Sequence, residues 1–234
     1  MMKPINDKAE LYRTAALLRR QLQLPEHCQS EAVLERICAQ PGVRVASLAF
    51  RSPALRGMCS PGKSGEPDVI LLSARLSARE RGFYAAHEWV HLCCHREKIN
   101  TPFRCREYGR PRQDSYLEWQ ANEGAAEIVM PWRQVAELVL ASPPDCTSRA
   151  SLIRLRLRLA DAFGVSDRMA AVRLESLRYE LAYALGGQPL ERIELLSSAE
   201  QRRRGIRVRS LEELAENLRQ RERDYYRRLR DIDI

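Results

Sequence analysis

One stretch restricts this chain more than any other: residues 84–95, Tyr-Ala-Ala-His-Glu-Trp-Val-His-Leu-Cys-Cys-His. It contains the pattern H-E-x-x-H in a run without Gly or Pro, so it can form a helix. On a helix, His87 and His91 lie one turn apart on one face, with side chains roughly 6 Å apart, so both can reach a single metal ion. Glu88 lies about 100° around the helix, where it can contact a water on that ion without binding the metal. The competing interpretation is a helix with two unrelated histidines, although the 234 residues include only four histidines.

A second segment, residues 117–131, predicts another helix that ends before Pro131. One face of this helix carries a carboxylate followed by small residues: Glu118, Asn122, Ala125, Ala126 and Val129. Such a narrow face allows another helix to approach closely. Glu118 is therefore the expected third ligand. Two histidines and one glutamate with an open position are the ligand set of catalytic rather than structural zinc.

Other polar residues near these motifs are not expected to bind the metal directly. Asn122 lies one turn after Glu118 and either accepts a hydrogen bond from a ligating histidine or simply packs between helices. Glu123 and Glu127 lie on a different face and are expected to form a solvated acidic edge. His95 is rotated about 80° from His87, so it is expected to be a solvated or hydrogen-bonded histidine rather than a ligand.

Together the two segments resemble the ImmA/IrrE family of metallo-endopeptidases. That family shows an aromatic residue and an Ala before H-E-x-x-H, then an E-x-x-A-N helix that ends in Ala-Ala, apolar residues and Met-Pro. The matching residues here are Phe83, Ala86, Glu118, Asn122, Ala125, Ala126, Met130 and Pro131. The chain departs from the family at Val90, where Gly is common, and at Glu123-Gly124, where a bulkier apolar residue often stands.

The resemblance implies a zincin-like domain that hydrolyses peptide bonds with Zn²⁺. His87, His91 and Glu118 would hold the ion, and Glu88 would act as general base. The resemblance also implies a regulatory protease that cleaves a specific partner, typically a Cro/cI-like transcriptional repressor with its own helix-turn-helix.

The rest of the N-terminal part predicts an α+β, mostly helical fold with a small sheet. Helices are expected at 8–22 and 30–38, and strands at 43–48 and 68–72, where apolar residues alternate or run together. Residues 51–67 carry most of the turn residues, and residues 96–115 are expected to be a loop between the two ligand helices.

This loop leaves two alternatives open. A closed structural zinc site could use His91, His95 and Cys105, but the spacing matches no familiar finger pattern, so small buried thiols are the preferred interpretation. Tyr108 or Tyr116 could stabilise an oxyanion, although both are more simply loop aromatics.

After residue 141 the sequence predicts further helices. Residues 157–174 read as a helix, a short turn at Gly164 and a second helix, which is the layout of a helix-turn-helix. We expect this pair to pack beside the catalytic domain. The alternative function is a DNA-binding regulator with a structural or sensory metal site and no hydrolysis. The expected domains are 1–141 (metallopeptidase), 146–190 (helix-turn-helix-like segment) and 191–234, a basic amphipathic extension that begins a helix with a capping box at Ser210–Glu213.

Composition limits the partners and the cell compartment that we expect for this chain. The net charge of +8, mostly from arginine, is compatible with a nucleic-acid or acidic partner, but a GC-rich genome gives the same arginine bias. No run of 18 apolar residues occurs, and the seven cysteines show no disulfide framework. We therefore expect a cytoplasmic protein without a membrane partner.

Overall fold

The computed structural model describes residues 5–63, 65–98, 103–106, 115–144 and 148–211, together with positions 213, 220, 223 and 227. Of residues 103–106 it describes the backbone. The chain divides into two compact units, one made of Met1–Pro131 with Ala162–Ser166 and the other of Trp132–Asp161 with Asp167–Ile234. The predicted division at 141 and 190 stays a prediction.

Four helices form most of the first unit: α1 (Lys8–Gln21), α2 (Ser30–Cys38), α3 (Ala78–Cys94) and α4 (Ser115–Val129). The predicted helices at 8–22 and 30–38 are confirmed by α1 and α2. Helix α3 packs against both α2 and α4, and α1 packs against α4. The α2–α3 contact is very close, since a Cβ on Gly82 would lie 1.9 Å from the Ser30 carbonyl oxygen.

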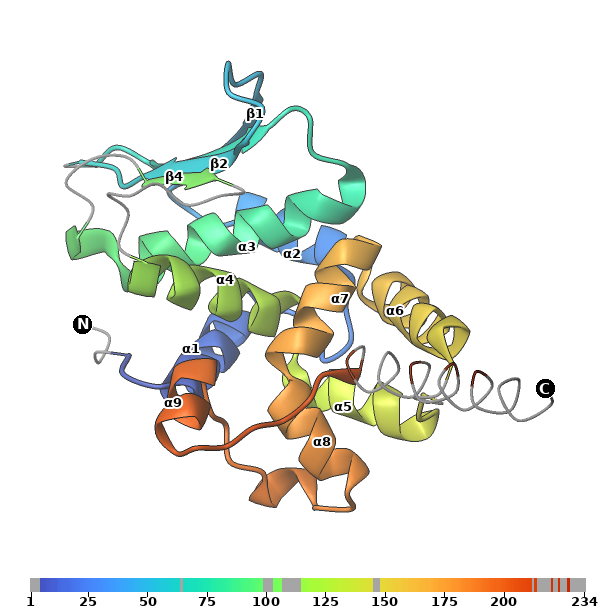
Figure 1. Ribbon diagram of the computed structural model, residues 1–234. Helices are drawn as coiled ribbons and strands as arrows, with labels where there is room; N and C mark the ends of the chain where they lie inside the picture. Colours follow the sequence, from blue (N-terminus) through green and yellow to red (C-terminus); the bar gives the residue numbers. More distant parts are fainter. Residues whose placement is uncertain are drawn as a thin grey trace. The chain divides into compact units, whose positions relative to one another are not determined.

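A four-stranded sheet covers α3 in Figure 1, with strands β1 (Val43–Leu48), β2 (Leu55–Ser60), β3 (Asp68–Ser73) and β4 (Phe103–Arg106). The strand order is β1-β3-β2-β4. Strand β1 runs parallel to β3, whereas β2 runs antiparallel to both β3 and β4. Ile70, Leu72 and Cys59 are buried, and β2 and β3 contact α3.

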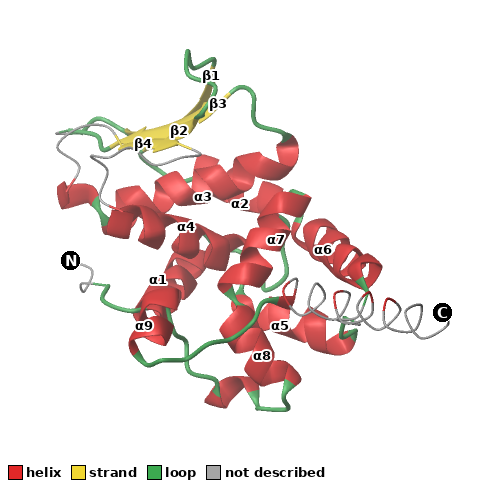
Figure 2. Cartoon of the chain, in the orientation of Figure 1, coloured by secondary structure: helices red, strands yellow, loops and turns green. Residues whose placement is uncertain are grey.

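Two of these strands correct the sequence prediction. Strand β2 lies in the segment that was expected to be mostly turn, and β4 lies in the expected loop. Strand β2 contains Gly57, Met58 and Cys59 in place of β-branched residues, so its own sequence favours a strand weakly. It forms because it can pair on both sides, with β3 and with β4. The fold class is as expected: mostly helical α+β with a small mixed sheet (Figure 2).

The second unit is helical, with α5 (Trp132–Ala141), α6 (Arg149–Phe163), α7 (Asp167–Ser176), α8 (Arg178–Leu185), the short 3-10 turn η2 (Leu190–Arg192) and α9 (Ser198–Arg203). Helix α8 packs against α5 and α7. Among the helices that the described residues form, none is long and apolar enough to cross a membrane.

The helix-turn-helix layout is present, as α6 and α7 flank Gly164 with a φ of 62°. The turn Ala162–Ser166 belongs to the first unit, where the Ser30 hydroxyl donates a hydrogen bond of 2.5 Å to the Gly164 carbonyl oxygen. Val165 is fully buried. The turn therefore has a packing role, and DNA binding by this helix pair stays a prediction.

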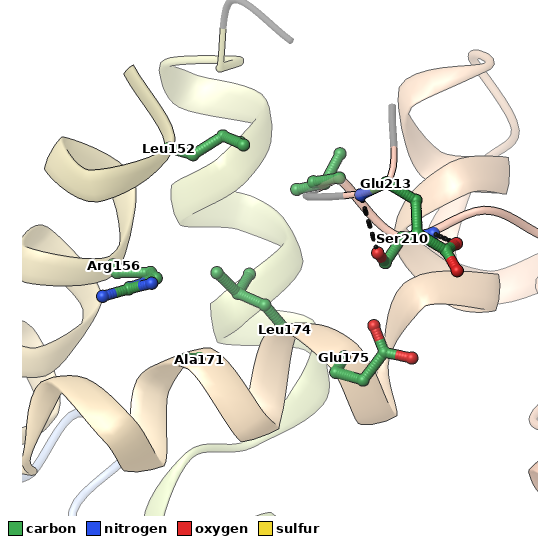
Figure 3. Close-up of a pocket in the computed structure, with 8 residues that line it drawn as sticks. Leu152, Arg156, Ala171, Leu174, Glu175, Ser210 and Glu213 are labelled. Atoms are coloured by element: carbon green, nitrogen blue, oxygen red, sulfur yellow. Dashed lines mark hydrogen bonds between the residues drawn. The ribbon is translucent and has the colours of Figure 1, made fainter. Parts of the chain in front are cut away.

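The segment after α9 forms one wall of a pocket in the second unit (Figure 3). The pocket is lined by Leu152 and Arg156 of α6, by Ala171, Leu174 and Glu175 of α7, and by Ser210, Leu211 and Glu213. The predicted capping box is confirmed, because the Ser210 backbone N–H donates to Glu213 Oε2 (2.8 Å) and the Glu213 N–H donates to Ser210 Oγ (3.1 Å). The rest of the predicted C-terminal helix lies largely outside the described residues.

Candidate metal centre

Helix α3 carries three of the predicted site residues. The helix begins at Ser77 with a capping box in which Glu80 accepts a hydrogen bond of 2.9 Å from the Ser77 backbone N–H. It then runs without a break to Cys94, so His87, Glu88 and His91 are all on regular helix. All three side chains are fully buried. The two imidazole rings are one turn apart, with their centroids 4.8 Å from each other.

Helix α4 brings Glu118 to the same two histidines. Glu118 Oε1 lies 3.3 Å from His91 Nε2, and Glu118 Oε2 lies 3.6 Å from His87 Nε2. The Nε2 atoms of His87 and His91 are 3.1 Å apart. Among the residues that the structure describes, these three form a group whose potential ligand atoms all lie within 4.8 Å of one another.

Burial keeps both histidines neutral. It lowers the pKa of His87 to about 3, with the neighbouring His91 adding to the shift and Glu118 and Asn122 opposing it. Burial and the neighbouring His95 lower the pKa of His91 to about 3 as well. A metal ligand must be a neutral imidazole, so both rings have the required protonation state at neutral pH.

Asn122 lies where a ligating histidine would need a partner. Its Oδ1 is 3.1 Å from His87 Nδ1. Because an amide oxygen can only accept, this contact places the proton of His87 on Nδ1 and a lone pair on Nε2. The contact is the one that the first of its two predicted roles requires, and the role of Asn122 in orienting a ligand stays a prediction.

Glu88 is set apart from the three converging side chains. Neither of its carboxylate oxygens has a nitrogen or oxygen hydrogen-bond partner among the described residues, which leaves the weak donor of the Cys59 thiol. Burial raises the pKa of Glu88 well above its ordinary value; the nearby Cys59 thiol lowers it and Glu118 raises it further. Strand β2 packs against α3 next to Glu88, and a Cβ on Gly57 of this strand would lie 2.6 Å from Glu88 Oε1. Position 57 therefore leaves room for the carboxylate only because it is glycine.

Comparison with known proteins identifies the domain. The family model of the IrrE N-terminal-like domain, peptidase family M78, matches residues 38–175. The chain belongs to this family. No curated protein matches the chain at a significant level.

One similar solved structure is a transcriptional regulator from Mycobacterium tuberculosis, with 14% sequence identity and a TM-score of 0.47. The match covers 73% of this chain and 47% of that one, so the chain spans less than half the length of that protein.

The M78 domain presents a donor set that fits a divalent cation. The lone pair of His87 Nε2 points at His91 Nε2, and a carboxylate that can only accept lies within 3.6 Å of both. Converging acceptors of this kind are satisfied by a cation. His87, His91 and Glu118 would hold it.

Two predictions about acidic side chains near the M78 site are corrected. Glu123 and Glu127 were expected on a solvated edge, yet both are buried, at 8% and 7% exposure. Glu123 accepts a hydrogen bond from the hydroxyl of Tyr12 on α1, and α1 covers this face of α4. The helical periodicity placed both residues correctly away from Glu118 but could not show that another helix packs there.

Of the residues in the alternative closed site, His95 is described and does not join the group. Two further cysteines, Cys93 and Cys94, lie at the end of α3. Burial raises the pKa of Cys93 to about 12 and that of Cys94 to about 11, so both thiols stay protonated and behave as small apolar residues. The side chain of Cys105 and the whole of Tyr108 lie outside the described residues. Tyr116 donates a hydrogen bond of 3.1 Å to the Ile5 carbonyl oxygen.

Proposed function

We propose that this M78 domain is a zinc-dependent endopeptidase. One observation carries the proposal: two neutral imidazoles and the carboxylate of Glu118 converge, while Glu88, on the helix that carries both histidines, has no nitrogen or oxygen partner for its carboxylate among the described residues. A buried carboxylate without a strong hydrogen-bond donor costs stability, so its retention favours a role in chemistry over a role in folding.

When bound, Zn²⁺ lowers the pKa of water to about 7 and polarises a carbonyl group. Glu88 supplies the proton transfers. It accepts a proton from the attacking water as the water oxygen bonds to the scissile carbonyl carbon, and it returns a proton to the leaving amine nitrogen as the C–N bond breaks. The raised pKa makes the Glu88 carboxylate a stronger proton acceptor than an exposed carboxylate, which favours removal of the proton from the attacking water.

The sheet offers a way to hold the substrate. Among the strands that the structure describes, in the order β1-β3-β2-β4, the two at the edges of the sheet are β1 and β4. Strand β4 pairs with β2, which carries Gly57 against Glu88. We propose that an extended substrate segment adds to the β4 edge, because backbone hydrogen bonds there would align a peptide bond alongside Glu88.

The proposed substrate class is a helix-turn-helix repressor of the Cro/cI type, on the strength of the sequence resemblance. A folded partner that docks elsewhere raises the local concentration of its scissile segment, so weak contacts in the cleft suffice. Cleavage should then occur at one or a few bonds, and unstructured proteins should be poor substrates.

The test uses the zinc-loaded full chain with a repressor encoded next to it and, separately, with casein. Products are read by mass spectrometry over time, with Glu88→Gln as the matched inactive control. Limited cleavage of the repressor by the wild type alone supports the proposal. Rapid digestion of casein at many sites with the repressor intact would contradict the regulatory substrate, whereas no cleavage of either would contradict the peptidase.

A further inference from the structure

A chain of side-chain contacts extends from His91 away from the metal centre. His91 Nδ1 lies 2.9 Å from His95 Nδ1, and His95 Nε2 lies 2.8 Å from Gln120 Oε1. Gln120 Nε2 then donates a hydrogen bond of 2.9 Å to the Ile5 carbonyl oxygen. His95 and Gln120 are 2% and 4% exposed, so water competes little for these contacts.

The Ile5 carbonyl, at the far end of this series of contacts, determines the direction of each hydrogen bond in it. A backbone carbonyl can only accept, so the Gln120 NH₂ group must face Ile5 and its Oε1 must face His95. An amide oxygen also only accepts, so His95 carries a proton on Nε2. The Nδ1 atoms of His91 and His95 are too close for both to carry a proton, and a His95 ring with its single proton on Nε2 presents a lone pair at Nδ1.

The tautomer of His91 follows from that of His95. The lone pair at His95 Nδ1 can accept only if His91 carries its proton on Nδ1. His91 Nε2 is then left with a lone pair, and this is the nitrogen that lies 3.3 Å from Glu118 Oε1. The Ile5 carbonyl is itself held by a second donor, the Tyr116 hydroxyl at 3.1 Å.

We infer that His95, Gln120 and the Ile5 carbonyl form a relay that holds His91 in the tautomer able to bind metal. His95 and Gln120 are positioning residues. Through them the Ile5 carbonyl, just before α1 in the sequence, fixes the orientation of His91. The effect on metal affinity rests on the proposed function, but the tautomers exist without metal and are measurable in the metal-free chain.

The first experiment reads the tautomers directly. Metal-free protein labelled with ¹⁵N is examined by long-range ¹H–¹⁵N correlation, and the four histidines are assigned by single His→Gln variants. We expect the proton on Nδ1 in His91 and on Nε2 in His95, whereas the exposed His27 should show no fixed tautomer. A proton on Nε2 of His91, or on both nitrogens of His95 at neutral pH, overturns the relay.

The second experiment measures zinc affinity by competition with a chelator. His95→Leu and Gln120→Leu should weaken binding by about 10- to 100-fold, the usual effect of losing a partner that orients a ligand. His95→Gln should recover most of the affinity, because its amide oxygen can still accept from His91 Nδ1. Cys93→Ala is the matched control on the same turn and should bind like wild type.

The outcomes separate the two proposals. Wild-type affinity in His95→Leu, or equal losses in His95→Leu and His95→Gln, overturns the relay while zinc binding stands. A wild-type chain that binds no zinc overturns the proposed function, and the tautomers then still decide the relay. If His95→Leu fails to fold, Gln120→Leu and the tautomer measurement decide.

Discussion

Glu88 and Glu118 are carboxylates with different environments in one small volume. Glu118 keeps 16% of its side chain exposed and lies against two imidazoles, whereas Glu88 is fully buried. The burial raises the pKa of Glu88, and the histidines give Glu118 two partners that can share a cation. Pairs of carboxylates in contrasting environments commonly take different roles in one reaction.

The first prediction concerns Glu88 alone. Glu88→Gln keeps the size of the side chain but cannot accept a proton, so turnover should fall by about 10²- to 10⁴-fold. Zinc content should stay near the wild-type value, and thermal stability at neutral pH should be equal or higher, because the amide avoids the cost of ionising a carboxyl group in this buried space. Kinetics on a confirmed substrate together with metal analysis check this. Normal turnover would remove Glu88 from the mechanism.

The second prediction separates metal binding from packing. Glu118→Ala should lose most of the bound zinc, as should His87→Ala and His91→Ala. Glu123→Ala should keep zinc but destabilise the fold by about 1–3 kcal/mol, since the hydroxyl of Tyr12 loses its buried acceptor.

Metal analysis and urea denaturation of these variants give the two readouts independently. Zinc loss in Glu123→Ala with zinc kept in Glu118→Ala would reverse the ligand assignment.

At the level of elements, the position of Glu88 depends on β2. A methyl group at position 57 would overlap Glu88 Oε1, so Gly57→Ala should displace the carboxylate. We expect kcat/KM to fall by about tenfold or more, since misplacing a reacting group by about 1 Å is costly. Zinc content should be retained, because the three atoms nearest to such a Cβ all belong to Glu88 and none to a proposed ligand.

Met58→Ala is the control for this variant. Successive side chains of a strand point to opposite faces, so Met58 faces away from Glu88 and its loss should leave kcat/KM unchanged. Equal kcat/KM in Gly57→Ala and wild type would show that Glu88 does not need its present position.

The helices were predictable where local signals agree, and the rest was not. Ser77 with Glu80 marks the start of α3, and Pro131 follows the end of α4, so both ligand helices follow from nearby residues. Strands β2 and β4 depend on pairing between distant segments and have little signal of their own. The relay behind His91 was missed for the same reason, since Gln120 and Ile5 are 115 residues apart.

For the whole molecule, the buried histidines predict how stability depends on pH without metal. The pKa of His87 and of His91 is about 3 in the folded chain and 6.5 ordinarily. Between these values the unfolded chain binds more protons, so the free energy of unfolding rises with pH. The contribution of the histidines is complete above pH 6.5 and is lost as pH falls towards 3. Glu88 acts in the opposite sense, because its raised pKa lowers stability as pH rises above 4.5.

Denaturation by urea in the presence of a chelator, repeated from pH 4 to pH 8, measures this dependence. The double variant His87→Gln/His91→Gln isolates the histidines, because Glu88 contributes to both proteins. The difference between wild type and variant should grow with pH up to about 6.5 and then level off. A difference that is flat over this range would contradict the buried neutral state of the two imidazoles.

The convergence of three acceptors also makes the stability of the folded protein depend on the concentration of the metal ion. With the tautomers proposed above, two lone pairs and a carboxylate face one another, and a cation between them would be favourable. An ion that binds only the folded chain adds RT ln(1 + [ion]/Kd) to its stability, about 4 kcal/mol at a thousand times Kd. Under the proposed function, scarcity of zinc would lower activity and would also enlarge the unfolded fraction that cellular proteases remove, so that the amount of this protein would follow the availability of the ion.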